Sequence, residues 1–267
     1  MLRPDDTIAV AVSGGKDSVS LLHILNRIER DFQGAGILAI TINEGISGYR
    51  SEALKIARKT CEQLGVKQRV LSFRELYGYE LDEIVRITGA RERLTPCSYC
   101  GVLRRKALNV AAKEVGASKL ATAHNLDDEV QTIFLNIVHG DVMRIARVEP
   151  AIEEALPKFV QRIKPLCEVP ENEVALYAYL KKIDSQITPC PYMYTSMRNT
   201  LRSTLNRLEV SYPGVKFTVF RAIEKIRPTL KMATVKVKLR NCAICGEPTV
   251  SKICKPCDTL QKLELLR

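Results

Sequence analysis

The sequence predicts an α/β protein built on a doubly wound parallel sheet, extended by basic helices and a small four-cysteine finger. Three observations support this prediction. Short apolar runs alternate with amphipathic segments of helical length, which is the pattern of βαβ units. A glycine turn joins the first apolar run to the first amphipathic segment. Two Cys-x-x-Cys pairs fall within sixteen residues near the C-terminus.

The first half of the chain predicts three strands and the helices between them. Residues 7–12 form a continuous apolar run, as expected of a strand that is buried on both faces. Helical periodicity over 16–28 and 50–64 predicts two helices, and Gly65 ends the second. Further strands are expected at 37–42 and 70–73, followed by a helix over 79–87.

The second half continues the alternation and then becomes basic. We expect a loop at 95–101 that leads into a helix over 102–115, then strands at 119–123 and 159–163 and a helix over 170–183. Two basic helices follow, at 196–208 and 215–226. The predicted domains are a catalytic domain (1–190), a basic helical region (191–239) and a finger (240–267).

The positive charge is concentrated at one end of the chain. Residues 198–267 contain 15 Lys and Arg against 5 Asp and Glu, whereas residues 1–197 contain 26 against 25. A solvated basic face with no partner is the simpler interpretation, but so sharp an asymmetry favours a polyanion. The sequence therefore predicts a near-neutral catalytic body and a basic end that binds nucleic acid.

Apolar patterning and cysteine usage predict a cytoplasmic protein. No apolar run reaches the length of a membrane span, and the N-terminus lacks the apolar core of a signal peptide. Nine cysteines in such a chain are expected to be metal ligands or thiols rather than disulfides. Cys61 and Cys167 have apolar neighbours and are expected to be buried.

The glycine turn has the composition of a phosphate site. Two adjacent glycines let backbone N–H groups approach an anion at the positive end of a helix. The turn also offers two hydroxyls, a cation and a carboxylate that can hold Mg²⁺. Its residues are Ser13, Gly14, Gly15, Lys16, Asp17 and Ser18.

The turn is not a Walker A loop, which needs four residues between its first Gly and Gly-Lys. It resembles the PP-loop of ATP pyrophosphatases, which cleave ATP between the α and β phosphates. A tight turn without a ligand is the alternative. Two carboxylates, Asp127 and Asp128, are expected at the same sheet edge, where they either cap a helix or bind metal or substrate.

The cysteine spacing predicts a zinc site near the C-terminus. Four thiolates in two knuckles suit a closed tetrahedral Zn²⁺ site formed by Cys242, Cys245, Cys254 and Cys257. So short a segment would take its folding energy from the metal.

A second cysteine group lies in mid-chain. Cys97 and Cys100 form a pair, and Cys190 stands in another proline-flanked loop. The pair is compatible with a redox dithiol or half a zinc site. Three thiolates together would leave one iron of a 4Fe-4S cluster open to an exogenous ligand such as sulfide.

The order of these motifs resembles that of the TtuA/NcsA group of tRNA 2-thiouridine synthases. The motifs are the glycine turn, Pro-Cys-Ser-Tyr-Cys-Gly at 96–101, His-Asn-Leu-Asp-Asp-Glu at 124–129, Thr-Pro-Cys-Pro-Tyr at 188–192 and the terminal finger. The resemblance covers essentially the whole chain.

The resemblance implies a two-step reaction. ATP on the PP-loop adenylates the C2 oxygen of a tRNA uridine and releases pyrophosphate, and sulfur then displaces AMP. It implies a 4Fe-4S cluster on Cys97, Cys100 and Cys190. The sulfur would come from a ubiquitin-like thiocarboxylate protein or inorganic sulfide, and the family tends to form homodimers.

The resemblance also assigns roles by position. It implies catalytic or Mg²⁺-binding roles for Asp17 and Asp128, and contact of Arg104 with the nucleotide or the sulfur intermediate. The nucleotide pocket would include Ile42, Ala123 and the last residues of the first strand, Ala11 and Val12.

Two alternatives remain at this point: a 2-thiocytidine synthase, which the terminal finger disfavours, and a non-catalytic, zinc-stabilised RNA-binding protein. Relatives usually carry a further cysteine knuckle before the first strand, where this sequence has only six residues. Either this subgroup lacks that knuckle or the sequence is shortened, and in both cases we expect the basic C-terminal quarter to carry more of the tRNA contact.

Overall fold

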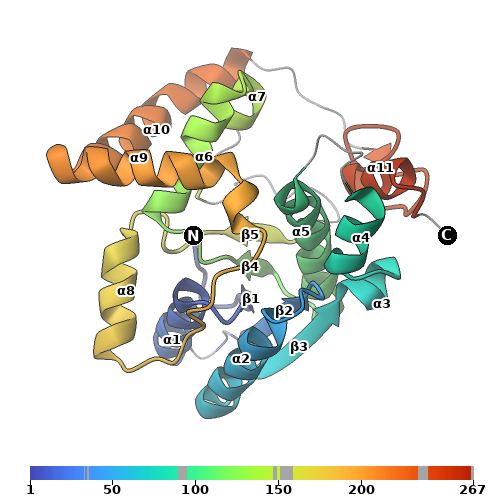
Figure 1. The fold of residues 1–267 in the computed structure, drawn as a ribbon. Helices are drawn as coiled ribbons and strands as arrows, with labels where there is room; N and C mark the ends of the chain where they lie inside the picture. Colours follow the sequence, from blue (N-terminus) through green and yellow to red (C-terminus); the bar gives the residue numbers. More distant parts are fainter. Residues whose placement is uncertain are drawn as a thin grey trace.

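A five-stranded parallel sheet forms the centre of the protein in a computed structural model that describes residues 1–32, 34, 36–89, 95–146, 149–150, 159–233 and 240–265 (Figure 1). The strand order is β3-β2-β1-β4-β5. Because the chain builds one side of β1 before it crosses to the other, the order reverses between β1 and β4, where ligands bind in such sheets. The strands are β1 (Thr7–Ala11), β2 (Gly36–Asn43), β3 (Lys67–Ser72), β4 (Lys119–Ala121) and β5 (Gln161–Ile163).

Helices cover both faces of the sheet because successive strand residues point to opposite sides. In β1, Ile8 and Val10 pack with α1 (Lys16–Glu29), α2 (Arg50–Leu64) and α8 (Glu171–Leu180). Ala9 faces the other core with α3 (Phe73–Tyr77), α4 (Leu81–Thr88) and α5 (Pro96–Glu114). Both faces are therefore buried, which explains why the first strand is apolar throughout.

A helical layer packs beyond β4 and β5 at the upper left of Figure 1. It contains α6 (Leu126–Val138), α7 (Val142–Ile145), α9 (Met197–Ser211) and α10 (Val215–Ala233), with a 3-10 turn (Met193–Thr195) before α9. The α10 helix continues past Pro228. The apolar core of this layer contains Leu126, Val130, Ile133, Cys167, Leu205 and Phe220.

The C-terminal finger docks on α5. It consists of a short antiparallel pair, β6 (Arg240–Asn241) and β7 (Pro248–Thr249), and of α11 (Lys255–Lys262). Leu260, Leu263 and Leu265 join the hydrophobic core that contains α5. An ion pair of 2.9 Å between Lys113 of α5 and Glu247 fixes the other side of the finger.

The predicted fold class is confirmed, and several local predictions are wrong. Residues 95–101 do not form a loop, because α5 already begins at Pro96. Phe73 starts α3 rather than ending a strand, because Ser72 forms a capping box with Glu75. The β4 strand ends at Ala121, two residues earlier than predicted. Among the described residues, no helix is both long enough and apolar enough to cross a membrane.

Candidate functional site

The glycine turn lies at the carboxyl end of β1 and leads directly into α1. Gly14 has a φ of +91°, and a Cβ built on it would lie 2.4 Å from the carbonyl oxygen of Ala53. Only glycine fits this position, both for its backbone conformation and for its space. Gly15 is the N-cap of α1, so the free N–H groups of the first helical turn face the site.

Hydrogen bonds of Ser18 and of a neighbouring loop fix the shape of the turn. Ser18 Oγ accepts from the backbone N–H of Ser13 at 3.0 Å and donates to the carbonyl of Gly15 at 2.9 Å. The backbone N–H of Gln186 donates to the carbonyl of Gly14 at 2.9 Å. The loop after α8 therefore supports the turn, a contact that the sequence pattern did not indicate.

Lys16 lies between two carboxylates. Its Nζ is 2.8 Å from Glu171 and 3.1 Å from Asp17. Burial lowers the pKa of Lys16, but the two carboxylates outweigh it and leave the pKa raised. Burial raises the pKa of Glu171, but Lys16 and Arg202 outweigh it and leave the pKa lowered. Lys16 is thus a cation, and it lies at the first position of α1, directly after the two glycines.

The two adjacent aspartates have different surroundings. Asp127 is buried, pairs with Lys216 of α10 and accepts from the backbone N–H of Glu171 at 2.9 Å, so it ties α6 to α8 and α10. Asp128 caps α6 with Asn125 and keeps about a third of its side chain exposed. The pKa of Asp128 is raised to about 6, mainly by burial. Asp17 and Glu171 also raise it, whereas the backbone N–H of Asn125 and the charge of Arg198 lower it.

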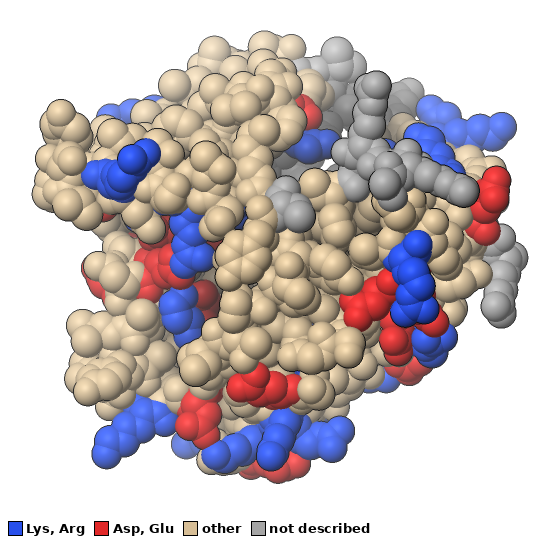
Figure 2. Space-filling view, in the orientation of Figure 1, with Lys and Arg blue, Asp and Glu red and all other residues tan. Residues whose placement is uncertain are grey.

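A cavity of about 320 Å³ brings several of the predicted site residues together. Asp17, Asp128 and Cys97 all line it, although they come from separate parts of the chain. Figure 2 shows the hollow between α8 and α9, where acidic and basic side chains lie together. The other lining residues are Asn125, Gln131, Glu171, Met193, Ser196, Arg198, Asn199 and Arg202.

Glu171 and Arg202 are site residues that the sequence analysis did not assign. Their side chains form an ion pair of 2.5 Å at this cavity. Glu171 follows Pro170 at the start of α8, and Arg202 lies within α9. A basic helix predicts only a charged surface, so the inward direction of Arg202 had no local signal.

Cys97 and Cys100 lie at the beginning of α5, and Cys190 lies in the loop before the 3-10 turn. Cys97 Sγ is 3.4 Å from the carbonyl oxygen of Tyr192, which places the Cys190 loop against α5. Burial raises the pKa of Cys97, and the charge of Cys190 raises it further. Burial also raises the pKa of Cys100, to about 11.

Three cysteine thiols brought together in this way are a donor set that an iron-sulfur cluster can use. In the described part of the chain, only the C-terminal cysteines form a group whose ligand atoms all lie within 4.8 Å of one another. The mid-chain thiols are near neighbours, because the charge of Cys190 raises the pKa of both Cys97 and Cys100. With three protein ligands, one iron would remain without a cysteine.

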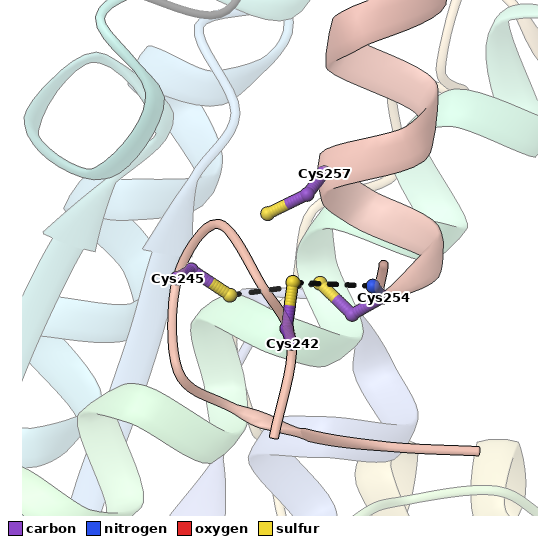
Figure 3. Close-up of side chains that lie close together, drawn as sticks. All are labelled: Cys242, Cys245, Cys254 and Cys257. Carbon is purple, nitrogen blue, oxygen red and sulfur yellow. Dashed lines mark hydrogen bonds between the residues drawn. The ribbon is translucent and has the colours of Figure 1, made fainter. Parts of the chain in front are cut away.

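The four C-terminal cysteines converge on one point (Figure 3). The sulfur atoms of Cys245 and Cys254 are 3.6 Å apart. Tetrahedral zinc with Zn–S bonds of about 2.3 Å requires sulfur atoms about 3.8 Å apart. Backbone N–H groups of Ile244 and Cys254 donate to the sulfur of Cys242. The donor set therefore fits Zn²⁺.

Arg104 lies one helical turn after Cys100. Its guanidinium donates to Cys100 Sγ at 2.9 Å and pairs with Glu44 at 2.6 Å. The Glu44 carboxylate strongly raises the pKa of Arg104, which is therefore a permanent cation. Glu44 directly follows β2, at the edge of the sheet where the site lies. A charged residue directly after a predicted strand is a pattern from which the sequence could have indicated this site residue.

The remaining predicted nucleotide residues lie at strand ends. Ala11 ends β1, and the backbone N–H of Val12 donates to the carbonyl of Ile40. Ala123 is half-buried, two residues after β4. The side chain of Ile42 is buried in the core that contains α5. Its carbonyl oxygen, near the end of β2, accepts a hydrogen bond from Arg50.

Comparison with known proteins adds three findings. Residues 2–209 match the family model of the ATP_bind_3 PP-loop domain. The chain is 38% identical to a probable sulfurtransferase of Methanocaldococcus jannaschii, over 100% of this chain and 77% of that protein. It is 34% identical to the tRNA 2-thiolation protein NcsA of Haloferax volcanii, over 97% of this chain and 83% of that protein.

A solved structure is similar across the molecule. It is the U34-tRNA thiolase NcsA from Methanococcus maripaludis with its [4Fe-4S] cluster, and its TM-score with this chain is 0.83. The two sequences are 35% identical, and the match covers 97% of this chain and 81% of that one.

Proposed function

The chain belongs to the PP-loop family and, within it, to the tRNA 2-thiolation proteins, so we propose that it uses ATP to replace the C2 oxygen of a tRNA uridine with sulfur. The observation that carries this proposal is the shared cavity. It joins Asp17 of the phosphate loop, Asp128 and the Cys97 thiol. An activation site and a sulfur site side by side suit a reaction in which one atom of a bound base is replaced.

The phosphate loop would carry out the activation step. The uridine O2 attacks the α-phosphorus of ATP, a new P–O bond forms, and the bond to pyrophosphate breaks. The N–H groups at the start of α1 and the Lys16 cation would neutralise the departing pyrophosphate. Asp17 and Asp128 would hold Mg²⁺, because both are oxygen donors at the same cavity.

Glu171 would act as the counterion of Lys16 before ATP binds. It pairs with both Lys16 and Arg202, so these two cations lie at the loop with their charges partly compensated. An incoming triphosphate offers them a stronger anion than one carboxylate. Lys16 would then turn from Glu171 to the phosphates.

The mid-chain cysteines would carry out the second step. Cys97, Cys100 and Cys190 fit a 4Fe-4S cluster, which when bound supplies an iron with a free position for sulfur. Sulfide adds to C2 of the activated base as HS⁻ and forms a C–S bond. The C2–O bond then breaks with its electron pair leaving on AMP, and N3, which lost its proton on activation, takes up the proton from sulfur. Arg104, fixed beside Cys100, would hold positive charge where the anionic AMP leaves.

The target would be the wobble uridine, because the similar solved enzyme is named as a U34-tRNA thiolase. The basic region at 191–239 would bind tRNA, and the finger would be a Zn²⁺ site that supports α5. We place the protein in the cytoplasm, since relatives in Saccharomyces cerevisiae and Chlamydomonas reinhardtii are named cytoplasmic tRNA 2-thiolation proteins.

Anaerobic assay of the purified protein tests this function. With ATP, Mg²⁺, sulfide and tRNA that lacks the modification, we expect pyrophosphate release and 2-thiouridine at position 34, detected by nucleoside mass spectrometry. Cys190→Ala should lose iron and sulfur incorporation but retain ATP binding. Cys61→Ala, which changes a buried thiol remote from the site, is the matched control.

Each alternative gives a different product. A 2-thiocytidine synthase would yield thiolated cytidine instead. A protein that only binds RNA would release no pyrophosphate when tRNA is added. Either result would reject the proposed function.

A further inference from the structure

We propose that Glu44 is a positioning residue that joins the ATP loop to the thiol site through two arginines. One of them, Arg50, holds the backbone of the phosphate loop. The other, Arg104, is held beside Cys100. This inference rests on the proposed function, because it assigns a role within the same reaction.

Glu44 lies in an enclosed position between the two cations. It directly follows β2, and 4% of its side chain is exposed. One carboxylate oxygen is 2.7 Å from Arg50 Nε, and the other is 2.6 Å from Arg104 Nε. Each oxygen therefore forms an ion pair with one arginine, and the carboxylate lies between the two guanidinium groups. The contact with Arg50 Nε is close but does not have the geometry of a hydrogen bond.

Arg50 connects this carboxylate to the phosphate loop. It is the first residue of α2, and 5% of its side chain is exposed. Its Nη1 donates to the carbonyl of Ser13 at 3.0 Å, and its Nη2 donates to the carbonyl of Ile42 at 2.5 Å. The rigid guanidinium fork thus fixes the first residue of the turn against the end of β2.

Arg104 is held by the other carboxylate oxygen. Its side chain is 45% exposed, so solvent alone would leave the guanidinium free to move. The ion pair with Glu44 and the hydrogen bond to Cys100 restrict it to one direction. Glu44 therefore determines where this positive charge lies relative to the thiols.

The charges in the cluster point to positioning rather than stability. Two cations share one carboxylate, which leaves a net charge of +1 on the group formed by Arg50, Arg104 and Glu44. Enclosed ion pairs cost desolvation and are weak evidence of stabilisation, and apolar residues of similar volume often serve stability as well. A rigid excess cation between a phosphate loop and a thiol is useful where anionic AMP must leave.

The first test measures whether Glu44 acts through Arg104. We compare single-turnover thiolation at saturating ATP for Glu44→Gln, Arg104→Ala and the double variant, corrected for iron content. Each single change should slow the reaction by about tenfold or more. At saturating ATP the support of the phosphate loop by Arg50 should not limit the rate, so the double variant should be no slower than Arg104→Ala, because Glu44 no longer has Arg104 to position. If the rate of the double variant falls by the product of the two single effects, Glu44 acts independently of Arg104 and the inference is overturned.

The second test uses protein without the cluster. ATP binding, measured by calorimetry, should weaken by about tenfold in Glu44→Gln and in Arg50→Lys, since both loosen the support of Ser13. The variant with both changes should bind no more weakly than either single one. Wild-type affinity in Glu44→Gln would overturn the Arg50 part of the inference.

Matched variants separate positioning from folding. Glu114→Gln removes an exposed ion pair with Arg69 and should leave both readouts unchanged. Glu44→Asp keeps the charge with a shorter reach and should give intermediate values, and it replaces Glu44→Gln if that variant fails to fold. If wild-type protein thiolates no tRNA while Glu44→Gln still weakens ATP binding, the proposed function fails and the Arg50 linkage stands.

Discussion

Gly14 is the residue on which the shape of the phosphate loop depends. Gly14→Ala would place a methyl group against the Ala53 carbonyl and force a left-handed conformation on alanine. We expect a loss of about 1 to 3 kcal/mol in the free energy of unfolding from backbone strain, and more from the clash. ATP binding should fall by at least about tenfold. Urea unfolding and calorimetry measure the two effects.

Gly48→Ala is the control for this experiment. Gly48 has a similar positive φ of +69°, but a Cβ there would meet nothing within 4 Å. The control therefore carries the strain without the clash, and it should retain ATP affinity. Equal losses of ATP binding in both variants would mean that strain alone, not the approach to Ala53, controls the loop.

The Mg²⁺ role proposed for Asp128 predicts that MgATP binding depends on pH. Its raised pKa of about 6 means that the carboxylate is protonated below this pH and ionised above it. Only the ionised form binds Mg²⁺, so affinity for MgATP should rise as the pH increases through about 6. Calorimetry across this range measures it. Asp128→Asn should bind more weakly and lose this step, and a step of the same size in that variant would exclude Asp128 as its source.

At the scale of elements, α5 links the thiol site to the C-terminal finger. Its first turns carry Cys97 and Cys100, and Arg104 follows one turn later. Further along the same helix, Lys106 donates to Cys257 at 3.8 Å and Lys113 pairs with Glu247. A disturbance of the finger would therefore reach the thiol site through a single helix.

Removal of zinc tests this linkage. At the proposed zinc site, a chelator that takes the metal from the four cysteines should lower the thermal midpoint, because leucines that follow the last of these cysteines belong to the core that contains α5. Calorimetric melting and zinc analysis measure it. Cys245→Ser should behave in the same way, whereas Cys61→Ser should retain zinc. An unchanged midpoint after complete zinc loss would contradict the linkage.

The start of α5 shows where sequence reasoning failed for a physical reason. Glycine, serine and cysteine around 97–101 suggested a loop, yet Thr95 and Pro96 form a helix start with proline at the first position. The proline lacks only an N–H group that would have no helical partner there. The Thr-Pro start is the stronger signal, and it outweighs the weak helix propensity of the cysteines. It places both thiols on a helix.

The strands, the glycine turn and the four-cysteine finger were predictable because each leaves a local pattern. Apolar runs mark strands that are buried on both faces, and fixed cysteine spacing marks a knuckle. Glu171 and Arg50 left no such pattern. Their partners, Lys16 and the Ser13 carbonyl, are distant in sequence, and only the sheet topology brings them together.

At the scale of the molecule, the uneven charge predicts how tRNA binding responds to salt. Arg221 and Lys225 lie one turn apart on α10, and both are exposed. Changing both to glutamate should weaken tRNA binding and reduce the slope of log affinity against log salt by about 2, one for each lost phosphate contact. Filter binding over a salt series measures this slope.

Lys55 and Arg58 on α2 provide the matched control. They are also exposed, and their change to glutamate alters the net charge by the same amount. If both pairs lower the affinity equally, net charge matters and α10 is not a specific tRNA surface. Arg202 is unsuitable for this test because its ion pair with Glu171 belongs to the cavity.

The strand order also determines when the site can form during synthesis. A growing chain that has released β1 and α1 already displays the phosphate loop, but Asp128, Glu171 and Arg202 have not yet been made. The sheet is complete at Ile163, and the cavity closes only when α8 and α9 have followed. Because chains emerge from the N-terminus, a complete sheet precedes a competent site, and a truncated product that folds would still be inactive.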